Sequence, residues 1–175
     1  MKNFDQPFIS DNSIVDLLNQ KVELEQKIEK HLKKNGFPHF SSKKFVGDLG
    51  EYYAILNLSH LFEENTLIAS KTSNAEYDIK GTLKIEVAKE WNLTQDVRLE
   101  VKTRYCQKGS PHLFGLSTQK FDILIYVSLN KDYSCHFIGL VRSSDIIPDI
   151  QKRISFNNYL DKIIYPTGIK FIPHI

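Results

Sequence analysis

The segment from Phe121 to Val127 constrains the fold of this chain more than any other part of the sequence. Every position in it except Asp122 is aliphatic or aromatic. A strand that is apolar on both faces is typical of a sheet that is covered on both sides. We therefore expect an α/β fold in which helices flank a central sheet.

Two stretches before this strand have the three- and four-residue spacing of apolar residues that predicts helices. The first spans residues 11–34, and the second begins at Ser41 or Ser42 and runs to about Phe62. The first is amphipathic and has a narrow apolar stripe. This leaves two interpretations open, because such a stripe packs either against its own domain or against a second copy of the chain.

From Thr66 onward the apolar residues alternate, which predicts strands. The predicted strands are 67–71, 75–80, 97–104, 122–129 and 134–141, with a candidate extra strand at 82–88. We expect one more helix at 111–119, although Gly115 is unfavourable there, and a hairpin turn at residues 130–132.

The second predicted helix contains several small residues, Gly47, Gly50 and Ala54. Each glycine in a helix costs about 1 kcal/mol relative to alanine, so we expect a neighbouring backbone to approach closely here. Glu51 lies one turn from both Gly47 and Ala54, so these small residues border its carboxylate. The expected apolar face of this helix consists of Phe45, Leu49, Tyr52, Tyr53 and Leu56.

The strand predicted at 97–104 has charged side chains on one face. Alternation places Glu100 and Lys102 on that face, about 7 Å apart along the strand. Asp78 lies on a similar charged face in the strand predicted at 75–80. Charges inside a covered sheet are costly unless they pair or hold a metal. If the two strands pair, we expect Asp78 to meet Glu100 and Lys102.

An aspartate, a glutamate and a lysine that converge in this way suit the hydrolysis of phosphodiester bonds. Two neighbouring carboxylates repel each other, and a hard dication relieves this repulsion through oxygen coordination. Bound Mg²⁺ polarises a phosphate and activates water, and a nearby lysine offsets charge in the transition state. We therefore predict Mg²⁺ as the cofactor, with Mn²⁺ as a substitute.

The combination of Asp78, the segment 100–102 and the helix containing residues 47–51 resembles the PD-(D/E)xK nuclease superfamily, which has the restriction-endonuclease-like fold. The resemblance covers about residues 45–140. It implies a central mixed β-sheet flanked by helices in the order α-β-β-β-α-β-β, preceded here by the N-terminal amphipathic helix. One departure is Tyr77, which stands before Asp78 where the family pattern has proline.

The resemblance also implies roles for individual residues. Asp78, Glu100 and the backbone carbonyl of Val101 would be metal ligands, Lys102 the catalytic lysine, and Glu51 an auxiliary acid on the helix. It implies double-stranded DNA as the substrate. The residues expected to contact DNA phosphates or metal-bound water are Lys71, Asn74, Arg104, Gln119 and Lys120.

The length of 175 residues fits one domain, and 41% hydrophobic with 25% charged residues excludes a disordered chain. We divide it into an N-terminal helical appendage (1–40), a nuclease-like core (41–141) and a C-terminal cap packed on the core (142–175). The sequence contains no apolar run of membrane-spanning length, and we expect no secretory signal. Two cysteines form no disulfide framework, which indicates a reducing compartment, so we expect a cytoplasmic protein.

The leading hypothesis is a Mg²⁺-dependent DNA endonuclease, most like a small type II restriction enzyme. A homodimer is expected, because two copies about a two-fold axis most simply cut both strands of a duplex. A junction-resolving or repair nuclease of the same fold is one alternative. The others are a non-catalytic domain that binds nucleic acid or protein, and a structural domain whose charged residues pair with one another.

Overall fold

The computed structural model describes residues 12–34, 43–70, 76–105, 112–148 and 153–168. Its helices are α1 (Asn12–Lys34), α2 (Lys43–Leu58) and α3 (Ile85–Trp91), with short 3-10 helices at Ser59–Leu61, Ser143–Asp145 and Phe156–Lys162. Its strands are β1 (Ile68–Ala69), β2 (Ile79–Thr82), β3 (Asp96–Tyr105), β4 (His112–Leu113), β5 (Ile123–Leu129), β6 (Cys135–Arg142), β7 (Ile154–Ser155) and β8 (Tyr165–Gly168). The fold is therefore α/β, as expected.

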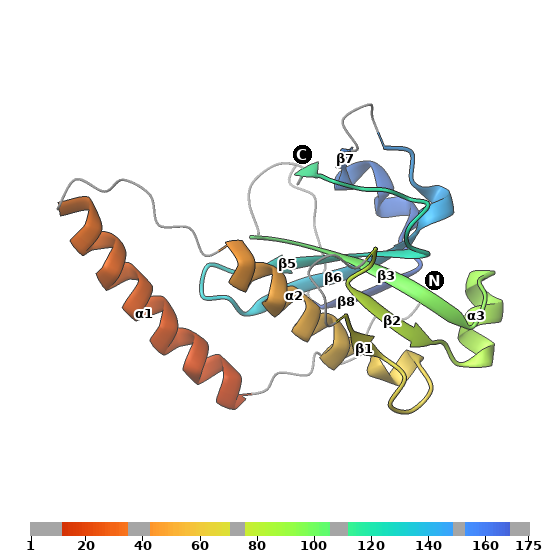
Figure 1. Cartoon of the computed structure of the whole chain (residues 1–175), viewed down its shortest axis with the longest axis horizontal. Coiled ribbons are helices and arrows are strands. Elements are labelled where there is room, and N and C mark those ends of the chain that lie inside the picture. The colour runs from red at the N-terminus through yellow and green to blue at the C-terminus, as the bar shows by residue number, and fades with distance from the viewer. Residues whose placement is uncertain (1–11, 35–42, 71–75, 106–111, 149–152, 169–175) are drawn as a thin grey trace.

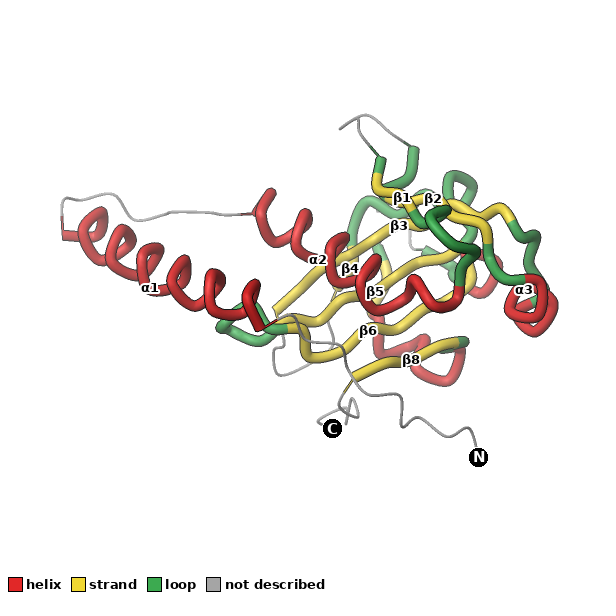
Figure 2. Tube along the Cα trace, turned by 90° about the horizontal axis from the view of Figure 1, so that it is seen from below, coloured by secondary structure: helices red, strands yellow, loops and turns green. Residues whose placement is uncertain are grey.

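Six of the strands form one mixed sheet in the order β1-β2-β3-β5-β6-β8, which Figure 2 shows across its width. The pairing of β3 with β5 is parallel, and all other neighbours in this sheet are antiparallel. The hairpin between β5 and β6 turns where it was predicted, and the N–H of Asn130 donates to the carbonyl of Ser134 (2.8 Å). A separate two-stranded ladder joins β4 to β7.

Each face of the sheet has its own apolar core. Helix α2 covers one face, where Leu49, Tyr53 and Leu58 pack with the odd-numbered residues of β3 and β5. The β4–β7 ladder and the 3-10 helix at Phe156–Lys162 cover the other face through Leu113, Ile154 and Phe156, which pack against the even-numbered residues of β5. The expected burial of β5 on both faces is confirmed, since all its residues are buried.

Helix α1 confirms the helix predicted at 11–34 and lies beside the β5–β6 hairpin (Figure 1). Leu18 is buried in the main core, and the hydroxyl of Tyr133 on the hairpin donates to the Glu25 carboxylate. One face of α1 therefore packs on its own domain. A flanking face of the helix leaves Leu17 63% and Leu24 58% exposed, and the role of that face in a dimer stays a prediction.

Two predicted elements were wrong. The candidate strand at 82–88 is largely helix α3, whose end is fixed by Asn92 in the left-handed conformation (φ 53°). The helix predicted at 111–119 is replaced, among the described residues 112–119, by β4 and a turn. Gly115 has a φ of 71° there, which no right-handed helix accommodates. The order α-β-β-β-α-β-β is thus not confirmed.

Candidate active site

The expected pairing with β3 is confirmed only in part: β2 begins at Ile79, so Asp78, which was predicted inside the strand at 75–80, directly precedes it. Strands β2 and β3 are antiparallel with Ile79 opposite Leu99, which brings Asp78 beside Glu100. The backbone N–H of Asp78 donates to the carbonyl of Leu99 (3.0 Å), and its Oδ2 accepts the N–H of Val101 (2.7 Å). The Asp78 carboxylate is therefore fixed against the backbone of β3 and leaves its second oxygen for another partner.

Strand β2 begins at Ile79, at the level of this contact. Within the described residues, no strand pairs with the β2 edge of β3 beyond Leu99. Because the N–H and C=O of one residue in a strand point to the same side, the carbonyl of Val101 faces this open edge, as its N–H does. The carbonyl oxygen of Val101 and the carboxylate of Asp78 thus lie at the same edge of β3.

Glu100 and Lys102 lie on one face of β3, as the alternation predicted. Lys102 Nζ donates to Glu100 Oε1 at 2.6 Å, and the two side chains are only 22% and 15% exposed, respectively. This contact satisfies one oxygen of Glu100. It agrees with the alternative that the charged residues of β3 pair with one another and serve only the structure. It does not involve Asp78 or Glu51, so ion pairing within β3 does not account for the whole group of acids.

Helix α2 carries Glu51 because Gly50 lets the helix approach β3. A Cβ at Gly50 would lie 1.8 Å from Oγ1 and 2.9 Å from Cβ of Thr103, so the expected close approach is confirmed there. The expected close approach is wrong for Gly47, where a Cβ would meet nothing within 4 Å.

The apolar face predicted for this helix is partly wrong. Leu49 and Tyr53 are buried as expected, but Tyr52 and Leu56 are only half-buried. The other buried residues are Ala54, Asn57 and Leu58. The Phe45 side chain lies outside the described residues.

The charges of these acids influence one another. Burial, followed by the negative charges of Asp78, Asp48 and Glu100, raises the pKa of Glu51 from 4.5 to about 7. Burial is also the main reason why the pKa of Glu100 is raised; the hydrogen bond and positive charge of Lys102 oppose this shift, and Asp78 adds to it. A proton or a cation at this place would relieve the repulsion between the carboxylates.

These groups fit a hard divalent cation in their chemistry. The hydrogen bonds to Val101 and Lys102 use Asp78 Oδ2 and Glu100 Oε1, which leaves the second oxygen of each carboxylate for a cation; the Val101 carbonyl faces the same edge, and Glu51 adds a third acid. In the part of the chain that the structure describes, however, no three histidine, cysteine or acidic side chains already form a metal-binding cluster. A metal would therefore require side-chain movement, including a change in the bond between Glu100 and Lys102.

The structure describes only three of the five side chains predicted to contact DNA, and all three are exposed. Lys71 and Asn74 lie outside the described residues. Arg104 is exposed on the face of β3 that carries Lys102, and its guanidinium donates to the Thr103 carbonyl (3.0 Å). Gln119 is exposed in a turn rather than on the predicted helix. Lys120 is exposed and forms an ion pair with Glu76 (3.4 Å).

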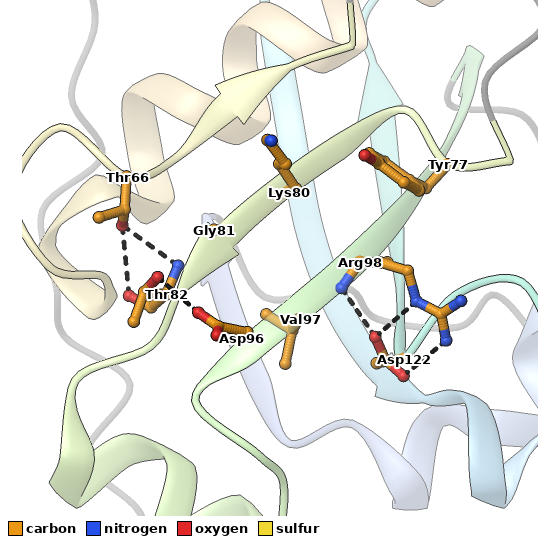
Figure 3. A pocket seen from close by; sticks show the side chains of 9 residues that line it. All are labelled: Thr66, Tyr77, Lys80, Gly81, Thr82, Asp96, Val97, Arg98 and Asp122. Atoms are coloured by element: carbon orange, nitrogen blue, oxygen red, sulfur yellow. Dashed lines mark hydrogen bonds and ion pairs between the residues drawn. The ribbon is translucent and has the colours of Figure 1, made fainter.

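A cavity beside this group was not predicted from the sequence. It has a volume of about 440 Å³ and lies over β2, β3 and the start of β5 (Figure 3). Asp122 closes one side: its carboxylate accepts the backbone N–H of Arg98 (2.8 Å) and two guanidinium N–H groups (both 3.2 Å). The sequence signal for this contact is that Asp122 is the one charged residue in the apolar segment 121–127, but its partner is not evident from the sequence.

Comparisons with known proteins add little to this geometry. No protein-family model matches the chain, and no curated protein matches it by sequence. Among solved structures, the bacterial homing endonuclease I-Ssp6803I aligns with 65% of this chain and 77% of its own, at 14% identity and a TM-score of 0.39. A likeness this slight supports no conclusion about function. Of the helices described, none has the length and apolar character needed to cross a membrane.

Proposed function

We propose that this protein is a metal-dependent nuclease that hydrolyses phosphodiester bonds in DNA, with its active site at the open edge of β3. The observation that carries this proposal is the position of Asp78. Its carboxylate accepts the N–H of Val101 at 2.7 Å, directly beside Glu100 and one pleat from Lys102. Asp78, directly before β2, and Glu100 and Lys102 on β3 are three residue types that suit this chemistry, and they lie near one another in the pairing of the two strands.

The acids would hold the cation, and Mg²⁺ is the proposed ion. Asp78, Glu100 and the carbonyl of Val101 are the proposed ligands, because they offer the oxygen atoms that hard dications prefer. When bound, Mg²⁺ polarises the scissile phosphate and lowers the pKa of an attacking water. Mn²⁺ is expected to substitute for it.

Lys102 and Glu51 have different roles in this proposal. Lys102 holds the attacking water and offsets the negative charge that develops on the phosphate in the transition state. To do so, it exchanges its present hydrogen bond with Glu100 for one with the substrate or water. Glu51 orients Lys102 or accepts a proton from water, which agrees with a pKa close to neutral.

The narrower proposal is a type II restriction endonuclease that cuts duplex DNA as a homodimer. A duplex has two antiparallel strands, and two copies related by a two-fold axis present one site to each. A junction-resolving or repair nuclease would share the same catalytic residues. The kind of DNA that the protein cuts, duplex or branched, therefore distinguishes a restriction endonuclease from a junction-resolving nuclease.

The test is cleavage of supercoiled plasmid and of a four-way junction by the wild type and by Lys102→Ala. The wild type should cut in Mg²⁺ or Mn²⁺ and stop in EDTA, and Lys102→Ala should cut about 100-fold more slowly or worse, the usual loss when a group that stabilises transition-state charge is removed. Lys89→Ala, which removes an exposed lysine from α3, is the matched control and should cut like the wild type.

Two results would contradict the proposal. Binding of DNA by the wild type without cleavage in any divalent metal would favour the non-catalytic domain. Absence of both metal and DNA binding in calorimetry would favour the structural domain, in which the contact between Lys102 and Glu100 serves stability alone.

A further inference from the structure

The cavity beside the proposed active site has the size of a ligand site. Its volume of about 440 Å³ is within the range of roughly 300–1,000 Å³ that small-molecule sites occupy. Tyr77, Lys80 and Arg98 line one side, and Thr66, Thr82 and Asp96 line the other (Figure 3). It is thus large enough for the sugar and phosphate of a nucleotide and not only for an isolated ion.

Most charged groups in this cavity are already paired. Asp122 binds both the backbone and the guanidinium of Arg98, and its own N–H donates to the carbonyl of Arg98 (2.8 Å). On the opposite side, the hydroxyl of Thr82 donates to Asp96 Oδ1 (2.8 Å). These contacts fix the walls and neutralise Arg98 and Asp122 against each other.

Lys80 is the cation that these contacts leave for a ligand. Its side chain is exposed, and among the contacts recorded for the described residues it forms no ion pair. It lies opposite Arg98 in the pairing of β2 with β3, so both side chains project from the same face of the sheet. Tyr77 adds an aromatic ring to the same wall, as Figure 3 shows.

The cavity and the acids occupy consecutive positions of one strand face. Arg98 precedes Glu100 by two residues on β3, and Lys80 follows Asp78 by two residues on the antiparallel strand, opposite Arg98. Two residues span about 7 Å along a strand. This is the scale of one nucleotide of an extended nucleic-acid strand, so a strand with one phosphate at Glu100 would bring a neighbouring phosphate to Lys80.

We propose that this cavity binds the nucleotide next to the scissile phosphate, with Lys80 contacting its phosphate and the Tyr77 ring lying against its sugar or base. This inference rests on the proposed nuclease function and adds a substrate-binding residue outside the acids and Lys102. Arg98 is a positioning residue here, because Asp122 holds it and it forms the wall between β3 and β5.

The test measures DNA binding without cleavage. A fluorescently labelled duplex is titrated with the wild type, Lys80→Gln, Lys80→Arg and Lys131→Gln in EDTA at 50 to 200 mM salt. Lys131 is an exposed lysine on the β5–β6 hairpin and serves as the matched control. Lys80→Gln should bind about fivefold more weakly, and its logarithmic salt dependence should be shallower by about one, since one phosphate contact is lost. Lys80→Arg and Lys131→Gln should bind like the wild type.

A second measurement locates the contact on the DNA. After the cut position is mapped on a defined duplex, single phosphates around it are replaced by neutral methylphosphonates. At one phosphate adjacent to the cut, the replacement should weaken binding by the wild type and leave binding by Lys80→Gln unchanged. Equal losses in both proteins at every position would overturn the proposed contact.

The outcomes separate this inference from the proposed function. If the wild type cuts DNA but Lys80→Gln binds and cuts like the wild type, the cavity proposal is wrong and the nuclease proposal stands. If the wild type binds no DNA, the nuclease proposal fails first. If a free deoxynucleoside monophosphate binds the wild type as tightly as the duplex and loses affinity in Lys80→Gln, the cavity is a small-molecule site and not part of a DNA-binding surface.

Discussion

Strands β3 and β5 are parallel neighbours in register from Leu99 and Ile123 to Tyr105 and Leu129, yet their surroundings differ. Every residue of β5 is buried, because β3 and β6 flank it and both faces are covered. In β3, buried residues alternate with partly exposed charged ones, and β2 leaves its outer edge at Leu99. The difference shows that charged side chains are tolerated on a central strand where one of its two faces is only partly covered.

The largest expected effect on the free energy of unfolding comes from comparing glutamine substitutions at two positions that lie opposite each other, one in β3 and one in β5. Leu124 lies opposite Glu100 and is fully buried. Leu124→Gln loses apolar burial and leaves an amide without a partner, so it should lower the free energy of unfolding by about 3–5 kcal/mol. Glu100→Gln takes the ion-pair partner from Lys102 but keeps a hydrogen-bond acceptor for it and relieves the repulsion with Asp78, so the loss should be smaller, about 1–2 kcal/mol. Urea unfolding followed by circular dichroism measures both.

The same pair of variants separates stability from activity. Glu100→Gln should retain its fold and lose metal-dependent cleavage, because a neutral amide is a poor ligand for a hard dication. If Glu100→Gln destabilises the protein as much as Leu124→Gln, Glu100 is a structural residue and the contrast between the two strands is broken.

The inner face of β3 offers a sharper comparison, because there it is packed as closely as β5. Gly50→Ala would place a Cβ 2.9 Å from Cβ of Thr103, a contact that rotation of the threonine hydroxyl does not relieve. It should lower the free energy of unfolding by about 1–3 kcal/mol, as overpacking does. Gly47→Ala, with nothing within 4 Å, should raise it by about 1 kcal/mol.

Thermal unfolding of these two variants checks the packing of α2 on β3. Thr103→Ala in the Gly50→Ala background should recover part of the loss, since it removes the nearest atom, Oγ1. A neutral or stabilising Gly50→Ala would mean that the helix can shift away from the strand. Glu51 would then have no fixed distance to Asp78 and Glu100.

The sequence was sufficient to predict elements whose periodicity is local. The period of α1 and the alternation in β3 are visible within a few residues, and the apolar run in β5 indicates burial on both faces. The pairing of β2 with β3 was expected from matching charged faces, and the register confirmed that Asp78 lies beside Glu100.

The errors occurred where a short pattern fits two structures or where partners are distant in sequence. Leu83, Ile85 and Val87 alternate as in a strand, but Ala88 and Trp91 complete the buried side of α3. The partner of Asp122 lies 24 residues away, and β8 joins β6 from beyond the predicted core. Such contacts depend on the position of the chain in space, which local spacing does not encode. The roles of the acids and of Lys102 remain predictions.

The smallest expected effect concerns Glu51, the acid on α2 whose pKa is raised by burial and by the charges of Asp78, Asp48 and Glu100. Its pKa of about 7 in the folded protein exceeds the ordinary 4.5, so between these values the folded state holds a proton that the unfolded chain releases. The stabilisation from this proton is fully present below pH 4.5 and is lost as the pH rises through about 7. After allowance for the partial exposure of the side chain, the loss should be about 1 kcal/mol.

Glu51→Gln removes this titration, so without metal the variant should be more stable than the wild type at pH 8 and about equally stable at pH 5. Urea unfolding at the two pH values measures the difference. Added Mg²⁺ should reduce the advantage of the variant at pH 8, because a cation near the acids stabilises the ionised carboxylate. If the stability difference between the two proteins is the same at both pH values, Glu51 does not share the charged environment of Asp78 and Glu100. The charged environment that distinguishes β3 from β5 would then not extend to helix α2.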